Sequence, residues 1–171
     1  MRGSAHALIM LAAAAGQVAG DTELNELFVE TYIDAPPEKV WDIMTGRMEE
    51  WWCPKPWRTE IVEQDWRAGG RDAMIMRGPN EGEEHPTEGI FLEVTPGVRF
   101  VSTDAVNHKM EPQQPFMIGT WELSPEGSGT RYRASARHWT EEARNQHAEM
   151  GFEQGWGACA QQLKELVEAT D

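Results

Sequence analysis

The apolar residues near the carboxyl end of the chain recur at the spacing of a helix. Steps of three or four residues separate Ala148, Phe152, Trp156, Cys159, Leu163 and Leu166 or Val167. At about 100° per residue these positions form one stripe, which a helix in water buries against a partner surface. We therefore predict a single helix over 140–169, longer than twenty residues, that lies across a sheet. Gly151 and Gly155 adjoin the stripe, and a close backbone approach or a slight bend would account for glycine there.

Before this helix the chain consists mainly of short runs of alternating apolar and polar residues, bounded by turn-forming residues. Such runs are typical of β-strands. We predict strands over 26–33, 59–66, 71–77, 87–94, 98–104, 116–123 and 130–139. Short turns connect most of these runs, so consecutive strands should be antiparallel neighbours. The fold class that follows is α+β, with an antiparallel sheet of six or seven strands and the terminal helix packed on it.

Between the first two strands the chain carries two proline-containing segments of different kinds. The segment 36–38, Pro-Pro-Glu, begins a short helix, because the first turn of a helix does not need the N–H that proline lacks. The segment 48–57 holds three tryptophans and two prolines. Those prolines exclude a regular helix or a central strand, so we predict a structured, aromatic-rich loop.

The last predicted strand indicates which of its faces meets the helix. Two sets of residues alternate along it: Arg131, Arg133, Ser135 and Arg137, and Tyr132, Ala134, Ala136 and His138. The mainly charged face should meet water and the other face the helix. The small side chains of Ala134 and Ala136 would then leave volume beneath the helix, and His138 points the same way.

The amino-acid composition limits the kinds of molecule that the protein is expected to bind. With 171 residues the chain is long enough for one domain with its own core. Its net charge of −14 disfavours nucleic acids and anionic membranes, which would repel it. Eight tryptophans and nine methionines suit either an irregular core or the lining of a hydrophobic pocket. The two cysteines, Cys53 and Cys159, match no zinc or redox spacing, and Cys159 falls on the buried stripe.

Residues 1–24 differ from the rest and are predicted to lie outside the domain, which spans 25–171. The single Arg2, the apolar run 7–15 and the small residues that follow are similar to a signal peptide. The run is too short to span a bilayer. Because the start carries only one charge, the alternative is an N-terminal extension or a start sequence foreign to the natural protein. We predict a cytoplasmic protein, with export as the alternative.

Several motifs occur together in one order along the chain. They are 33–41 with its Asp-Ala-Pro-Pro-Glu, Trp51-Trp52, Gly69-Gly70-Arg71, Met76-Arg77-Gly78-Pro79, Gly89-Ile90-Phe91, and 147–157 with its Gly-Trp-Gly. With the predicted element order, they resemble the helix-grip fold of the START-related (SRPBCC) superfamily. The closer resemblance is to its branch named for activators of the heat-shock-protein-90 ATPase, the AHSA1-like domains. It covers about residues 26–168 and departs at Cys53, where a glycine is expected after the paired tryptophans.

The resemblance implies a curved sheet that grips the terminal helix, with a short helix pair after the first strand and an apolar cavity between helix and sheet. It implies no single reaction, because relatives include lipid carriers, hormone receptors and cyclases. We expect the cavity beneath the N-terminal half of the helix. The predicted ligand-binding residues are Trp41, Trp52, Trp121, Ala134, Ala136, His138, Phe152, Gly155 and Trp156.

The predicted function is a binding module for a small hydrophobic or amphipathic molecule. One alternative is a cyclase- or hydrolase-type enzyme that uses the same cavity. The other is a co-chaperone-like interaction domain for a protein partner, as the family name suggests. The chain carries none of the common catalytic motifs, and we predict no metal site and no cofactor.

His138 is the best single candidate for proton transfer, with a carboxylate in the pocket as the alternative, although a hydrogen bond to a neighbour is the favoured interpretation of His138. We expect His147 and Glu149 to be solvated on the helix surface. We also expect Arg71 and Asp72 to lie on an exposed strand, the alternative being an ion pair between them at the mouth of the cavity.

Overall fold

The structure is a computed structural model that describes residues 25–171. The predicted N-terminal extension, with its signal-like run, lies outside the described residues. Seven strands form one antiparallel sheet in the order β1-β7-β6-β5-β4-β3-β2. The strands are β1 (Glu26–Ile33), β2 (Arg58–Gln64), β3 (Arg71–Arg77), β4 (Glu84–Thr95), β5 (Arg99–Thr103), β6 (Ile118–Glu126) and β7 (Gly129–Arg137). The predicted α+β fold and antiparallel sheet are therefore confirmed, and β1 and β2 are the two edges.

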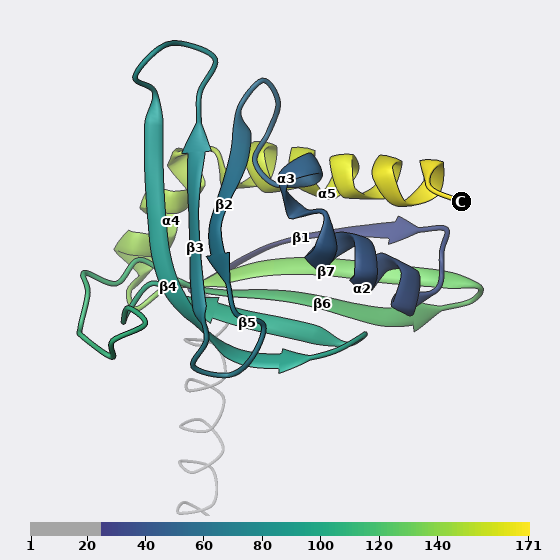
Figure 1. Cartoon of the computed structure of the whole chain (residues 1–171), viewed down its shortest axis with the longest axis horizontal. Helices are drawn as coiled ribbons and strands as arrows, with labels where there is room; N and C mark the ends of the chain where they lie inside the picture. Colours follow the sequence, from purple (N-terminus) through teal and green to yellow (C-terminus); the bar gives the residue numbers. More distant parts are fainter. Residues whose placement is uncertain (1–24) are drawn as a thin grey trace, which may run out of the picture.

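Four helices lie in the described chain. They are α2 (Pro37–Gly46), α3 (Met48–Trp51), α4 (Glu141–Glu149) and α5 (Phe152–Ala169). Figure 1 shows the curved sheet with α5 lying across it, α3 in front of α5, and α2 in front of β6 and β7 in the view. The helix pair after the first strand is confirmed, and α2 begins at Pro37 as the proline rule predicts. The first turn of the predicted aromatic-rich loop is the short helix α3.

The C-terminal region contains two helices, so the prediction of one uninterrupted helix over 140–169 is wrong. The Thr140 hydroxyl accepts a hydrogen bond from the Ala143 N–H and begins α4. Gly151 then adopts a φ of 95°, a left-handed conformation that glycine tolerates and that ends a helix. The remaining helix, α5, has 18 residues. The stripe did not reveal this break, because apolar residues stand at helical spacing on both sides of it.

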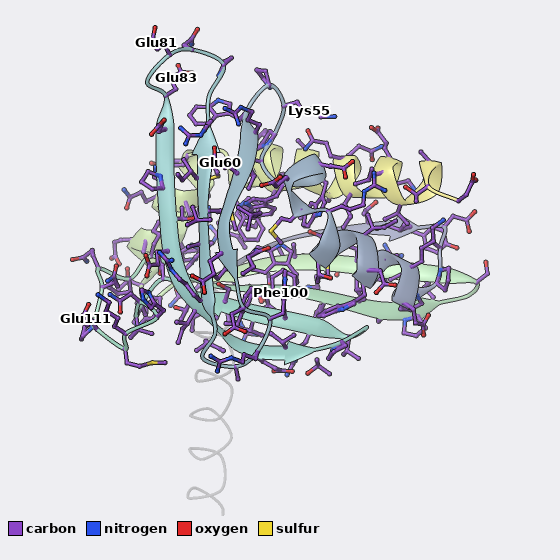
Figure 2. All side chains as sticks on the ribbon, in the orientation of Figure 1. Lys55, Glu60, Glu81, Glu83, Phe100 and Glu111 are labelled. Carbon is purple, nitrogen blue, oxygen red and sulfur yellow. The ribbon has the colours of Figure 1, made fainter. Side chains whose placement is uncertain are left out.

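The hydrophobic core lies between the sheet and the helices α2, α3 and α5. The stripe of α5 is buried as predicted, with Leu163 and Val167 fully inaccessible and Leu166 only partly buried. The sequence analysis left Leu166 and Val167 as alternatives for the last position of the stripe, and Val167 is the one that joins the core. Figure 2 shows Phe100 inside the fold, whereas Glu81 and Glu83 project from the β3–β4 loop and Glu111 from the β5–β6 loop.

Candidate functional site

Three indole rings occupy the region beneath the first turns of α5, where the sequence predicts a cavity. Trp121 of β6 and Trp156 of α5 stack with ring centroids 5.2 Å apart. Trp52, which follows α3, meets both rings edge-on at 5.4 and 5.3 Å. Trp121 and Trp156 are buried, and Trp52 is partly buried. The structure thus brings three predicted lining residues together, but as a packed cluster.

The aromatic packing continues from this cluster across the sheet. Phe100 stacks on Trp121 with centroids 4.8 Å apart, and Trp66 meets Phe100 edge-on at 5.0 Å. Trp66 also stacks on Phe91 at 4.5 Å. Trp41 packs against Phe100, with ring centroids 6.3 Å apart. Among the described residues no aromatic contact joins Trp41 to Trp156. Sequence reasoning missed Trp66, Phe91 and Phe100 as part of the site, although each falls in or at the end of a predicted strand.

The small residues of β7 face the helix side, as strand alternation predicts. Ala134 and Ala136 are fully buried, and the register pairs Ala134 with Trp121. The small side chain of Ala134 makes room for the large ring of Trp121 beside it. Gly155 lies against the loop after α3, because a Cβ added there would meet the Pro54 ring at 3.8 Å. This is an ordinary van der Waals contact, so the close backbone approach that the sequence suggested for Gly155 is not what the structure has there.

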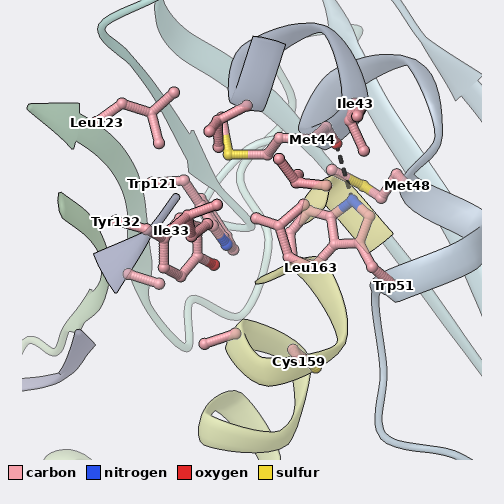
Figure 3. Close-up of a cluster of buried hydrophobic side chains, with 14 of the residues drawn as sticks. Ile33, Ile43, Met44, Met48, Trp51, Trp121, Leu123, Tyr132, Cys159 and Leu163 are labelled. Atoms are coloured by element: carbon pink, nitrogen blue, oxygen red, sulfur yellow. Dashed lines mark hydrogen bonds between the residues drawn. The ribbon is translucent and has the colours of Figure 1, made fainter. Parts of the chain in front are cut away.

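Two polar groups inside the core lack a hydrogen-bond partner among the described residues: the Tyr132 hydroxyl and the Trp121 indole N–H. The register pairs Tyr132 with Leu123, two residues from Trp121, so the two side chains are diagonal neighbours on one face of the sheet. Figure 3 shows both side chains in the cluster with Cys159 and Leu163. Burial raises the pKa of the Tyr132 hydroxyl well above its usual range, so this group stays a neutral donor. Sequence reasoning did not select Tyr132.

His138 and His147 form a buried hydrogen-bonded pair beside this cluster. His138 Nδ1 lies 3.1 Å from the Asn25 carbonyl oxygen, and His138 Nε2 lies 2.9 Å from His147 Nδ1. A carbonyl oxygen only accepts, so Nδ1 of His138 carries a proton, and in the neutral ring Nε2 has the lone pair. His147 Nδ1–H then donates to it, and the lone pair of neutral His147 is on Nε2. His138 therefore makes the hydrogen bonds to neighbours that the sequence analysis favoured.

The expectation that His147 is solvated is wrong. Only 8% of the residue is exposed, since Phe116 and Phe152 pack against its ring at 4.7 and 5.0 Å. Burial, together with the neighbouring His138, lowers the pKa of His147 to about 4. His147 lies on the side of α4 that faces the core. In a single continuous helix this residue would have pointed away from the apolar stripe. Glu149 is exposed, as expected.

Arg71 and Asp72 point to different partners. Arg71 pairs with Glu63 and Glu88, each at 3.0 Å. Asp72 accepts hydrogen bonds from Gln64 at 3.1 Å and Ser102 at 2.8 Å, and burial raises its pKa. Asp72 is thus part of a partly buried polar cluster, which corrects the expectation of an exposed strand surface for this residue. The alternative of an ion pair between Arg71 and Asp72 is also wrong.

The two cysteines, distant in sequence, meet where the loop after α3 crosses α5. Both are free and buried, and the Cys159 thiol lies against the backbone amide of Cys53. Burial raises the pKa of Cys53, and that of Cys159 to about 12. Neither thiol is therefore a ready nucleophile, because the reactive species is the thiolate.

We expect the native protein to react very slowly with iodoacetamide. With a pKa of about 12, Cys159 at pH 8 should hold roughly a thousandfold less thiolate than an ordinary cysteine. Mass spectrometry should find little alkylation in buffer and two modified residues in denaturant. The variant Cys159→Ala, measured alongside, reports Cys53 alone. Rapid alkylation of Cys159 in the folded protein would contradict this assignment.

No helix of the described chain combines the length and apolarity needed to cross a membrane. Within residues 25–171, no group of three or more His, Cys, Asp or Glu side chains is arranged to hold a metal ion.

The comparisons with known proteins agree with this architecture. The sequence profile of the family "Activator of Hsp90 ATPase homolog 1-like protein" matches residues 34–168. No curated protein matches the chain. A crystal structure of a protein from Nitrosomonas europaea is 38% identical, covering 85% of this chain and 95% of the other, with a TM-score of 0.79. A protein from Mycobacterium smegmatis, 24% identical over 88% and 95% of the two chains, has the same fold with a TM-score of 0.72.

Proposed function

Because the chain belongs to the AHSA1-like family of the START-related (SRPBCC) superfamily, we propose that it binds a small apolar molecule between α5 and the sheet. The ligand would carry a hydrogen-bond acceptor such as a carbonyl oxygen. The observation that supports this proposal is the pair of buried donors without partners, the Tyr132 hydroxyl and the Trp121 N–H. Leaving such groups unpaired costs about 1–3 kcal/mol each, and a ligand oxygen would recover part of that cost.

The route into the interior would pass Trp52. This ring is the partly buried member of the three-indole cluster, and it comes from the loop after α3. The Trp52 carbonyl accepts a hydrogen bond from the Thr59 hydroxyl at 2.9 Å, which holds the backbone of this residue in place. Displacing the Trp52 ring would open the space beside Trp121 and Trp156 to a planar or elongated molecule, which suits aromatic walls.

Tyr132→Phe tests the proposal through two effects of opposite sign. With Nile red, an apolar dye with a carbonyl oxygen, the variant should bind roughly 2- to 12-fold more weakly, because one hydrogen bond is worth about 0.5–1.5 kcal/mol. The unfolding free energy of the variant should stay constant or rise, since an unsatisfied buried hydroxyl is removed. Fluorescence titration and urea denaturation measure the two quantities.

The matched control is Tyr32→Phe, which removes the hydroxyl of the other tyrosine, a partly exposed residue of β1. It should leave the affinity for Nile red unchanged. Equal affinity in wild type and Tyr132→Phe would reject the role of the hydroxyl, and absence of any dye binding by the wild type would reject the proposal itself.

A further inference from the structure

The outer edge of β1 is capped by α5 at one end only. Lys164 Nζ donates to the Tyr32 carbonyl at 2.8 Å, and a Glu168 carboxylate oxygen accepts from the Asp34 N–H at 2.9 Å. Side chains of α5 therefore satisfy the edge groups at the end of β1. Toward its beginning the edge has no such cover among the described residues.

The register identifies which backbone groups are open. The β6–β7 hairpin turns through Gly127 and Ser128, so its flanking residues Glu126 and Gly129 form a hydrogen-bonded pair. Counting from this pair, the even-numbered residues of β7 direct their N–H and C=O groups to β1, where they meet odd-numbered partners. The N–H and C=O groups of Phe28 and Glu30 consequently point to the free edge. No hydrogen bond to any of these four groups comes from outside β1 and β7 in the described chain.

A groove of about 620 Å³ lies at this open part of the edge, between β1 and the junction of α4 with α5. Its apolar lining includes Leu27, Phe28, Ala148 and Phe152. Gly157 of α5 also lines it, and a Cβ added at Gly157 would meet nothing within 4 Å. The groove differs from the interior beneath Trp156, because it opens on the outer edge of the sheet.

Arg144 supplies the groove with a cation that has no carboxylate partner. Its Nη1 donates to the Asn145 side chain at 3.0 Å, while its Nε is buried without a partner among residues 25–171. Of the arginines in the described chain, only Arg58 shares the lack of a carboxylate within 4 Å. Two carboxylates also line the groove: Glu30, which is 3.5 Å from Arg133, and Glu153, which has no ion-pair partner among residues 25–171.

The geometry points to a peptide-binding site at this edge. An extended peptide carrying a carboxylate would add as an eighth strand beside Phe28–Glu30, using their open backbone groups. One of its apolar side chains would enter the groove beside Ala148 and Gly157, and its carboxylate would pair with Arg144. The backbone bonds give affinity for an extended chain, and the groove with Arg144 gives selectivity for the side chains.

The test uses fluorescence anisotropy with a labelled hexapeptide of alternating valine and threonine and a free carboxyl terminus. The full-length wild type should bind it, and Gly157→Leu should weaken binding at least about tenfold by filling the groove. This variant should fold, since leucine favours a helix over glycine and meets open space there. Arg144→Gln should weaken binding at least about fivefold, whereas Arg58→Gln, the matched arginine on the opposite edge strand, should not.

Chemically altered peptides test separately the backbone pairing with β1 and the contact of the carboxylate with Arg144. Methylating alternate peptide nitrogens in the two possible patterns should abolish binding in one pattern only, the one whose N–H groups face β1. Amidating the terminus should weaken binding as Arg144→Gln does, and an amidated peptide ending in Asp should regain affinity, because it restores a carboxylate at that end. No binding up to about 1 mM, or binding that Gly157→Leu leaves unchanged, overturns the proposal. A wild-type dimer that Gly157→Leu dissociates in sedimentation would replace it with self-pairing of β1. Nile red affinity should be the same in all these variants, so failure here is distinct from failure of the interior site.

Discussion

Leu163→Ala should lower the free energy of unfolding by about 2–5 kcal/mol, the range for deleting a fully buried leucine side chain. Leu163 is completely inaccessible in the middle of α5. Figure 3 draws it in the same buried cluster as Met44 and Trp51. The rigid neighbours of a large aromatic core relax little, so the cavity left behind adds to the lost transfer energy. Urea denaturation of the variant measures the change.

Leu92→Ala is the matched control, because Leu92 is 44% exposed on β4. The same chemical change there should stay within about 0.5–1 kcal/mol. A loss below about 1 kcal/mol for Leu163→Ala would show that the buried face of α5 is assigned incorrectly.

Acid should destabilise the protein through His147. An unfolded histidine has a pKa near 6.5, and in the fold burial lowers the pKa of His147 to about 4. Between these two values the unfolded chain binds a proton that the folded chain does not. The free energy of unfolding therefore falls as the pH drops through this window, by on the order of 2 kcal/mol between pH 7 and pH 5.

His147→Asn isolates this effect from the titration of the many carboxylates. Asparagine retains an N–H that can donate to His138 Nε2 but takes up no proton near neutral pH. The pH dependence of the unfolding free energy should therefore be shallower in the variant than in the wild type over this window. Nuclear magnetic resonance should also find the His147 ring neutral at pH 5.5. Parallel pH profiles for the two proteins would contradict the buried, neutral state of His147.

The sequence predicts most of the fold because its signals are local. Alternation and turn residues located all seven strands, and strand parity placed Ala134 and Ala136 against the helix side. The helix break escaped prediction because a left-handed Gly151 depends on tertiary packing, and a glycine at helical spacing is compatible with either outcome. The error in the position of His147 follows directly from that break.

The candidate site was less predictable, since it depends on how rings from distant segments fit together. The sequence selected Trp52, Trp121 and Trp156, but not that their rings stack with one another. Whether large side chains line a space or fill it depends on their rotamers, which composition and periodicity do not specify. The open part of the β1 edge was beyond sequence reasoning too. It depends on the strand order and on how far the side chains of α5 reach.

The break at Gly151 divides the C-terminal region into parts of unequal stability. Only His147 of α4 is buried, whereas α5 buries six residues. Local unfolding requires least free energy where few apolar contacts are lost, so α4 should open and close as a separate unit while α5 stays folded. Each opening would remove one wall of the β1 groove and expose the imidazole of His147 to protons. Lower pH would then favour the open form of α4 well before the whole domain unfolds.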